Sequence, residues 1–459
     1  MAKELKAKGV GLVINTIGFN VDDAARQELQ CIAQVAGGKY ADVSDTSTLT
    51  KALTDAKTRT ANRYENKARQ LNPTPKPDSA PVVDFQSEET VTVRSEIRDG
   101  ENYFKLTLKP GERCTVALNT IPNYEGNEGL SDYLIMDTQF VDAQGEEVTR
   151  KSGAGFFSEG LTFTRGTGAI SKDYDASQMG DSLFVRVKRS ANYQAPDKYP
   201  VEMTFRKIAP LAPGAETPTV RPSASSKSAP LNIAGKPREV PKPGLWFDEA
   251  TALEPNQPVT STVVSNEMQF YKVRLTEGQS LHGLLRVDEF DDKIVEDSGN
   301  RLSFKIYSPD RILSDHKVQA LDSLQNGKSE SFTSVSKVDY ANTFDADAGL
   351  DFDEAALWAP GEYFVAVHYA VLGSRDDYAK NKKHRQLKYS LVAQPVGQPQ
   401  QGPKFATDTA ATTKPETTQE ANADEAEDGP NLLLMGGIAV AGLALLGIIV
   451  ASVVALVRR

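Results

Sequence analysis

The chain has 459 residues, with 52 Lys and Arg against 62 Asp and Glu, so its formal net charge is −10. This length accommodates about three domains, and the acidic balance excludes a basic surface that neutralises the phosphates of a nucleic acid. The two cysteines, Cys31 and Cys114, exclude a disulfide-dense scaffold and a four-cysteine zinc site.

The first eight residues (MAKELKAK) are charged and contain no apolar core, so they do not form a signal peptide. Two interpretations remain open. Either an export signal lies upstream of this start, or the chain is anchored by its tail with its bulk in the cytoplasm.

Residues 9–43 predict a strand, a helix and a second strand. Gly9–Thr16 is a nearly continuous apolar run, typical of a strand buried on both faces of a parallel sheet. Asp22 and Asp23 suit the start of the helix, and Lys39–Val43 returns to an extended conformation. Because one such unit cannot bury both faces of its strand, we expect it to be the end of a larger α/β domain.

Four blocks in this region resemble the last strand and helix of a von Willebrand factor type A (VWA) domain, in the variety found in single-pass envelope proteins of actinobacteria. They are Val13–Phe19, Ala25–Gln30, Cys31–Ala33 and Gly37–Tyr40, and the likeness continues through Leu49–Leu53. The resemblance implies a magnesium site on an Asp-x-Ser-x-Ser loop and a partner for Cys31, but both belong to the missing front of the domain. Magnesium binding is therefore not expected for this chain.

Residues 49–71 predict a helix rich in Ala, Lys and Arg that connects this unit to the next part of the chain. We assign residues 1–70 to the truncated VWA part with its connecting helix. The prolines of residues 71–81 predict a stiff extended spacer.

Residues 82–208 and 244–397 share a repeat of alternating apolar and polar residues. Tyr103-Phe104-Lys105 matches Phe270-Tyr271-Lys272, and Leu183-Phe184-Val185 matches Tyr363-Phe364-Val365. Such alternation predicts half-buried antiparallel strands, so the fold class is mostly β, with two antiparallel β-sandwich domains. The two segments resemble the jelly-roll-like modules known as pre-peptidase C-terminal domains.

Two tracts lack the apolar residues needed for a core. Residues 209–243, rich in Pro and Ser, predict a linker between the sandwiches, and Gly244–Ala250 after them again resembles the actinobacterial VWA proteins. Residues 398–430 carry seven carboxylates and one aromatic residue and predict a disordered acidic stalk.

The stretch Leu432 to Val457 contains no charged residue. As a helix rising ~1.5 Å per residue it is about 39 Å long, enough to span a ~30 Å hydrocarbon core with tilt. We expect a transmembrane helix at 431–457, in contact with membrane lipid. Arg458 and Arg459 favour a cytoplasmic C-terminal tail with the bulk of the chain outside, and glycine and alanine at four-residue spacing leave a homodimer through this helix as an alternative.

One acidic run, Asp345 to Glu354, has the oxygen ligands that calcium prefers. Its candidate ligands are Asp345, Asp347, Asp351 and Asp353. The spacing departs from that of a twelve-residue calcium loop, so a solvated acidic loop is the favoured interpretation, and calcium bound to stiffen the loop is the alternative.

The sequence contains no recognisable catalytic set: the four histidines are scattered, and neither a nucleophile elbow nor a phosphate loop is present. We expect no enzyme and no cofactor. The predicted function is a single-pass cell-envelope protein that presents β-sandwiches to a protein or glycan partner. The alternative is a structural or assembly factor that organises a membrane complex through its VWA portion.

Overall fold

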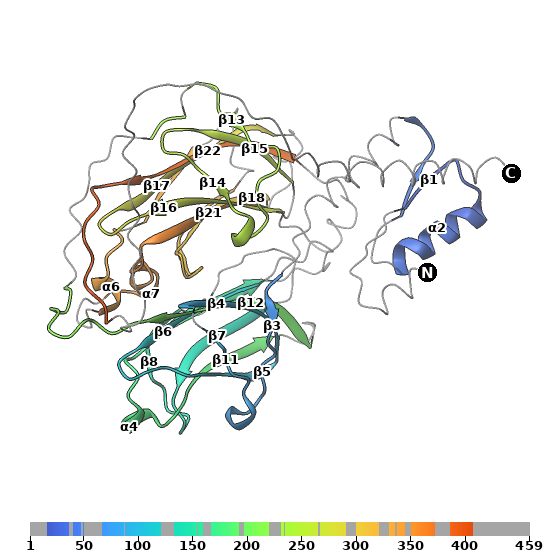
Figure 1. The fold of residues 1–459 in the computed structure, drawn as a ribbon. Helices are drawn as coiled ribbons and strands as arrows, with labels where there is room; N and C mark the ends of the chain where they lie inside the picture. Colours follow the sequence, from blue (N-terminus) through green and yellow to red (C-terminus); the bar gives the residue numbers. More distant parts are fainter. Residues whose placement is uncertain are drawn as a thin grey trace, which may run out of the picture. The chain divides into compact units, whose positions relative to one another are not determined.

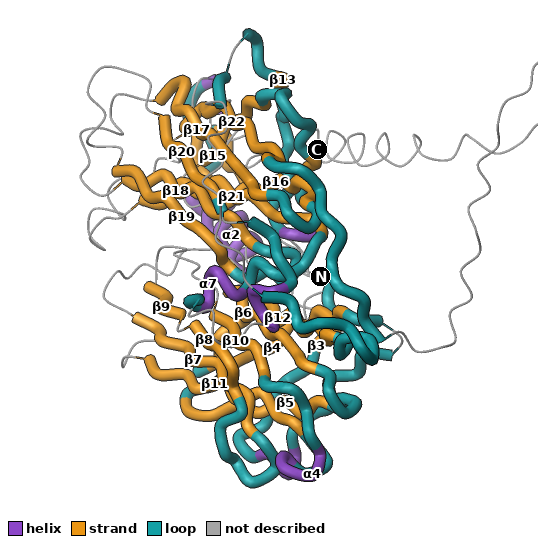
Figure 2. The backbone as a smooth tube through the Cα atoms, turned by 90° about the vertical axis from the view of Figure 1, so that its left-hand side faces the viewer, coloured by secondary structure: helices purple, strands orange, loops and turns teal. Residues whose placement is uncertain are grey.

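The computed structural model describes residues 16–35, 40–46, 49, 67–86, 88–120, 133–153, 155–158, 167–191, 197–219, 231–233, 235–264, 267–290, 300–320, 330–335, 337–344, 350–371 and 386–406. Strands dominate this part of the chain, and its helices are short (Figure 2). The prediction of a mostly β fold is therefore confirmed. None of the helices in the described ranges is both long and apolar enough to cross a membrane, and the predicted span at 431–457 lies outside these ranges.

The N-terminal unit contains strand β1 (Thr16–Phe19), helix α2 (Asp23–Val35) and strand β2 (Tyr40–Val43), shown in blue in Figure 1. β1 and β2 pair in parallel. Most of the strand expected at residues 9–16 lies outside the described residues. The described strand continues to Phe19, beyond the predicted end, because residues 16–19 pair in register with residues 40–43.

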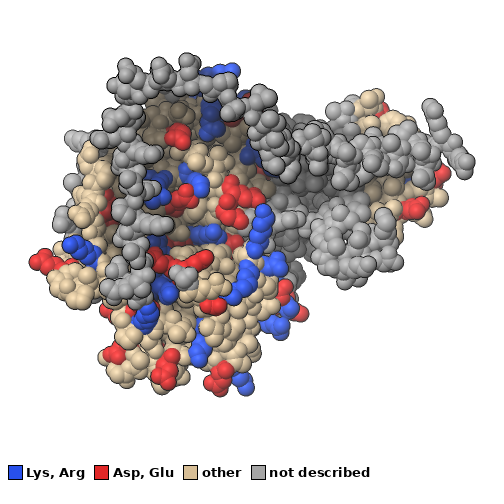
Figure 3. Space-filling view, viewed as in Figure 1, with Lys and Arg blue, Asp and Glu red and all other residues tan. Residues whose placement is uncertain are grey.

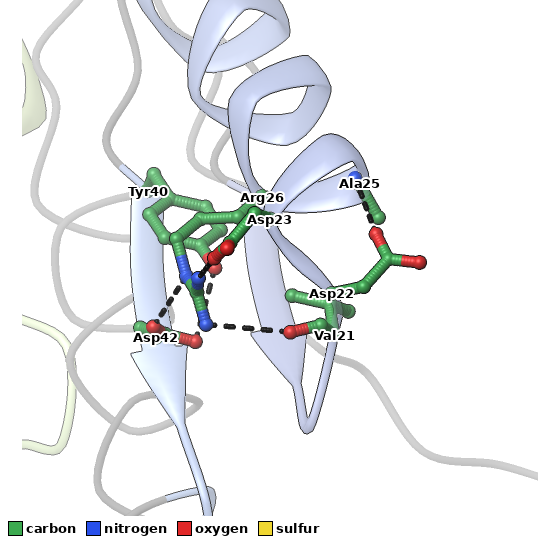
Figure 4. Close-up of polar contacts among 7 residues, drawn as sticks. All are labelled: Val21, Asp22, Asp23, Ala25, Arg26, Tyr40 and Asp42. Atoms are coloured by element: carbon green, nitrogen blue, oxygen red, sulfur yellow. Dashed lines mark hydrogen bonds and ion pairs between the residues drawn. The ribbon is translucent and has the colours of Figure 1, made fainter.

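A polar cluster holds the start of α2 against β2 (Figure 4). The carboxylate of Asp22 accepts the amide N–H of Ala25 at 2.8 Å, so it caps the helix as the sequence predicts. Arg26 on α2 donates to the carboxylate of Asp42 at 2.8 Å, and the Tyr40 hydroxyl donates to the same carboxylate at 3.1 Å.

The first sandwich consists of a six-stranded sheet in the order β3-β4-β12-β6-β10-β8 and a four-stranded sheet in the order β5-β11-β7-β9. Its strands are β3 (Arg69–Gln70), β4 (Thr90–Arg98), β5 (Gly100–Leu106), β6 (Arg113–Thr120), β7 (Tyr133–Val141), β8 (Thr149–Gly153), β9 (Gly155–Ser158), β10 (Thr167–Ser171), β11 (Leu183–Ala191) and β12 (Lys198–Ile208). Two short helices accompany them, η1 (Pro77–Ser79) and α4 (Ala176–Met179). Residues such as Phe104, Val116, Phe140 and Phe205 fill the core between the sheets.

The second sandwich has two five-stranded sheets, in the orders β13-β15-β22-β17-β20 and β14-β16-β21-β18-β19. Its strands are β13 (Arg238–Glu239), β14 (Thr251–Ala252), β15 (Val259–Val264), β16 (Met268–Leu275), β17 (Ser280–Phe290), β18 (Asn300–Tyr307), β19 (Leu313–Ala320), β20 (Glu330–Ser334), β21 (Gly361–Val371) and β22 (Gln386–Val396). Its helices are η2 (Phe247–Glu249), α6 (Ala341–Phe344) and α7 (Phe352–Ala355).

A chain of buried polar groups joins the two sheets of the second sandwich. The hydroxyls of Tyr271 and Tyr389 lie 2.6 Å apart, and Tyr389 donates to the side-chain oxygen of Gln269 at 2.5 Å. Gln269 in turn donates to the carboxylate of Glu267 at 3.0 Å. Burial raises the pKa of Glu267 to about 7.

The strand pairings place the repeated residues of the two sandwiches at equivalent positions. Phe104 on β5 lies opposite Val185 on β11, and Tyr271 on β16 lies opposite Val365 on β21. In each half, one sheet also begins with a short edge strand that pairs in parallel. β3 pairs with β4 in the first sandwich, and β13 pairs with β15 in the second. Both halves therefore share a core strand order, in which β3-β4-β12-β6-β10 corresponds to β13-β15-β22-β17-β20, while the first half adds β8 and the second adds β14 (strands labelled in Figures 1 and 2).

Segments that the sequence assigns to spacers contribute to the sandwiches. Leu71, at the end of the predicted connecting helix, lies beyond the extended pair Arg69–Gln70 and donates its amide to the carbonyl of Arg94. In the predicted linker, Ile233 and Val240 are buried against the second sandwich. Apolar residues spaced among prolines are therefore enough to dock these segments against the sandwiches.

One glycine tests how closely the two sheets of the second sandwich pack. A Cβ atom on Gly283 of β17 would lie 2.5 Å from the ring of Phe304 on β18. We expect Gly283→Ala to lower the free energy of unfolding by about 1–3 kcal/mol, because the ring has no room to retreat in a packed core. Urea denaturation measures the change. In a Phe304→Leu background, the same substitution should lower the free energy of unfolding by less. An equal decrease in both backgrounds would contradict close packing of Gly283 against Phe304.

Candidate functional site

Strand β6 is buried on both of its faces, although it belongs to an antiparallel sheet at one side of its sandwich. Cys114, Val116 and Leu118 face the core of the first sandwich. On the opposite face, Ala117 and its neighbour Ile170 pack against residues of the second sandwich, namely Ile312, Phe352, Ala355 and Ala356. The outer face of this sheet is therefore covered by the second sandwich, and we call this contact the seam.

Asp310 lies at the centre of the seam with only 1% of its surface exposed. Its carboxylate accepts three hydrogen bonds: from the hydroxyl of Thr115 at 2.9 Å, from the guanidinium of Arg206 at 3.0 Å and from the indole N–H of Trp358 at 2.9 Å. Thr115 and Arg206 belong to the first sandwich, whereas Trp358 belongs to the second. The guanidinium of Arg206 also lies 4.8 Å from the centre of the Trp358 ring.

A second carboxylate, Glu202 on β12, occupies the same seam and is equally buried. It accepts the indole N–H of Trp246 at 2.7 Å and pairs with the guanidinium of Arg311. Arg311 stacks over the ring of Phe247, and its backbone carbonyl accepts a hydrogen bond from the side-chain amide of Asn119 at 3.0 Å. Burial raises the pKa of Glu202, while the charge of Arg311 acts in the opposite direction.

Arg113 on β6 provides a third contact across the seam. Its guanidinium donates to the backbone carbonyl of Thr343 at 2.6 Å, pairs with Asp173 and lies 4.4 Å from the centre of the Phe344 ring. Arg150 donates to the carbonyl of Phe344 at 2.9 Å. At this contact the first sandwich supplies the arginines, and the second supplies an aromatic ring and backbone carbonyl groups.

The chemistry of the seam is that of an interface between rigid modules. Its two carboxylates are satisfied by partners on both sandwiches, so they are not available as ligands for a metal or a substrate. Buried ion pairs contribute little net stability, but leaving one partner alone costs several kcal/mol. The seam therefore favours one relative placement of its residues over alternatives.

The candidate calcium ligands are only partly described. Asp345 and Asp347 lie outside the described residues, whereas Asp351 and Asp353 are exposed at helix α7. The carboxylate of Asp351 accepts the amide N–H of Glu354 at 2.9 Å, so it caps this helix. Within the described ranges, no three His, Cys, Asp or Glu side chains form a group that could hold a metal ion.

The histidines and cysteines of the described strands and helices are placed without a catalytic pattern. His282 and His368 are buried in β17 and β21, and burial lowers the pKa of both. Cys31 is exposed on α2, and Cys114 is buried, with its pKa raised by burial.

The seam residues were missed by the sequence analysis. Glu202, Thr204 and Arg206 alternate with buried Val201, Met203 and Phe205 along β12, a pattern that ordinarily predicts a solvent-facing side. The one available signal was Trp246 in the block that opens the second sandwich, because a tryptophan N–H in a buried position needs an acceptor.

Charges on the exposed face of the described residues are mixed. In Figure 3, basic and acidic side chains alternate over this face, and neither sign forms a continuous field. The described residues on this face therefore form no continuous basic track.

Comparisons with known proteins identify no family and only weak structural similarity. No family model matches the chain, and no curated protein matches it. Among solved structures, it is similar to the CUB1-EGF-CUB2 domains of human MASP-1/3, at 10% identity and a TM-score of 0.17, with 66% of this chain and 100% of that chain covered. It is also similar to tandem CBM51 modules of a family 98 glycoside hydrolase from Streptococcus pneumoniae, at 9% identity and a TM-score of 0.16, with 66% and 83% covered.

We expect Asp310→Ala to lower the free energy of unfolding by about 3–5 kcal/mol, because it leaves the buried guanidinium of Arg206 without its carboxylate. Urea denaturation at pH 7 measures the loss. Glu96→Gln is the matched control, since it removes an ion pair with Lys198 whose side chains are 43% and 48% exposed. That change should cost less than about 1 kcal/mol. If both variants lowered the free energy of unfolding equally, the pair of Asp310 and Arg206 would be as solvated as the pair of Glu96 and Lys198, which would contradict a buried seam.

Proposed function

We propose that this chain is a membrane-anchored, non-catalytic envelope protein that presents two β-sandwiches, joined by the seam, to a protein or glycan partner. The observation that carries the proposal is the seam itself. It buries Asp310 and Glu202 among groups from both sandwiches, so the pair behaves as one presenting unit. A preorganised pair of modules loses less conformational freedom on binding than two tethered ones.

The anchor in this proposal is the uncharged stretch 432–457, preceded by the acidic tract and followed by two arginines. The sandwiches then lie outside the cell, and the arginines lie in the cytoplasm. The acidic tract separates the sandwiches from the lipid surface.

A second candidate function is that of an assembly factor that acts through the N-terminal unit. The parallel pairing of β1 with β2 and the cover of α2 support a VWA-like arrangement there. In that case the two sandwiches serve as a rigid spacer, and the partner contacts the N-terminal unit.

The anchor is tested with the full-length chain in cells. We expect the wild type to enter the detergent phase of a Triton X-114 partition, and protease added to intact cells to cleave its sandwiches. Leu445→Arg with Ile448→Arg should move the chain to the aqueous phase, because each arginine at a helix centre costs about 2.5–3.5 kcal/mol. Thr412→Arg with Thr417→Arg, which adds the same two charges to the acidic tract, should leave the partition unchanged. Aqueous partition of the wild type, or sandwiches that resist the added protease, would contradict the proposal.

Presentation and assembly are separated by the part of the chain that binds. The protein displayed on the cell surface should bind saturably to isolated envelope fragments. If both sandwiches contact the partner, Asp310→Ala should weaken that binding. Binding that depends only on residues 16–46 would favour the assembly role.

A further inference from the structure

The last described residues, Gly397–Ala406, leave strand β22 and run as an extended strap over both sandwiches. The strap crosses the turn between β16 and β17, where the amide of Gln400 donates to the carbonyl of Glu277 at 2.7 Å. It then pairs with the segment that follows β12. The amide of Ala406 donates to the carbonyl of Pro210 at 2.8 Å, and the amide of Ala212 donates to Lys404 at 2.9 Å.

Aromatic rings hold the strap in place beside the seam. The ring of Phe405 lies 5.0 Å from that of Tyr340 and 6.0 Å from that of Phe344. Gly402 passes so close that a Cβ atom on it would lie 2.4 Å from the Tyr340 ring. Tyr340 also contacts Trp358, the ring that donates to Asp310. The strap thus covers an aromatic cluster that continues into the seam.

Beneath the strap, Glu277 contacts both of the elements that hold it. Its backbone carbonyl binds the strap, and one carboxylate oxygen accepts the amide of Tyr340 at 3.3 Å. Glu277 is 7% exposed, and its other carboxylate oxygen is buried without a hydrogen-bond partner. The neighbouring Asp339 adds a second negative charge and pairs with Lys337 at 2.9 Å. A proton on the buried Glu277 carboxyl removes the cost of burying a charge there and its repulsion by Asp339.

We propose that residues 397–406 form a proton-controlled strap: a proton on the Glu277 carboxyl holds the strap across both sandwiches, and loss of that proton loosens it. Loosening uncovers the aromatic cluster of Tyr340, Phe344 and Trp358 and removes one of the ties between the sandwiches.

The direction of the effect follows from the environment of Glu277. Burial, with the charge of Asp339, raises the pKa of Glu277 to about 7 from an ordinary 4.5. A carboxyl with a raised pKa stabilises the closed state fully below its ordinary pKa, and this stabilisation is lost as the pH rises through about 7. The titratable and charged groups on the elements around Glu277 are Lys337, Asp339, Tyr340, Tyr363, Arg206, Glu89 and, on the strap, Lys404.

Hydrogen exchange of the full-length chain in detergent tests the strap. We expect protection of the Gln400 and Ala406 amides, corrected for intrinsic exchange rates, to fall on the order of tenfold between pH 5.5 and pH 8. In Glu277→Gln, which imitates the protonated side chain, protection at pH 8 should match that of the wild type at pH 5.5. In Asp339→Asn the fall should occur at lower pH, because one negative charge is removed.

Glu267→Gln is the control, because Glu267 has a similarly raised pKa while its carboxylate binds Val264 and Gln269 in the second sandwich instead of the strap. It should keep the wild-type dependence on pH. Equal protection of the wild type at both pH values, or an undiminished fall in Glu277→Gln, would overturn the proposal. A fall abolished by Glu267→Gln would overturn it as well, since the titrating group would then lie in the core.

Discussion

The buried carboxylate of Asp310 is the contact on which the arrangement of the two sandwiches depends. It belongs to the second sandwich, yet two of its three hydrogen-bond donors belong to the first. An isolated carboxylate in such a place would cost far more than a sandwich could supply. Its burial requires Arg206, Thr115 and Trp358 to be in position together. The two sandwiches therefore cannot separate without exposing a charge to water or leaving it unpaired.

This requirement explains the composition of the outer face of the first sandwich. Ala117 and Gly168 are small where the second sandwich approaches, and a Cβ atom on Gly168 would lie 2.9 Å from the ring of Phe352. Around these small residues stand the arginines and Glu202. The face combines close packing at its centre with charge pairing at its border, the usual anatomy of a specific protein interface.

The strap adds a further contact between the two sandwiches at the end of the described chain. Residues 397–406 join the exit of β22 to the exit of β12 through main-chain hydrogen bonds. The last described residues therefore lie beside the seam and contact both sandwiches. A partner that binds the sandwiches therefore contacts a unit that is held rigid at the seam.

The sequence by itself determined the strands, the repeat and the cap of α2. Alternating apolar residues predict strands such as β7 (Tyr133–Val141), and the matched triplets around Phe104 and Tyr271 lie at equivalent register positions. These features are local, because a two-residue period and a capping carboxylate need no knowledge of the rest of the chain. Only the tertiary structure decided that Glu202 and Arg206 are buried, that Ile233 docks and that the strap returns to the sandwiches. A polar residue on the outer face of a strand looks the same in sequence whether water or a second module covers it, and long-range contact alone distinguishes the two.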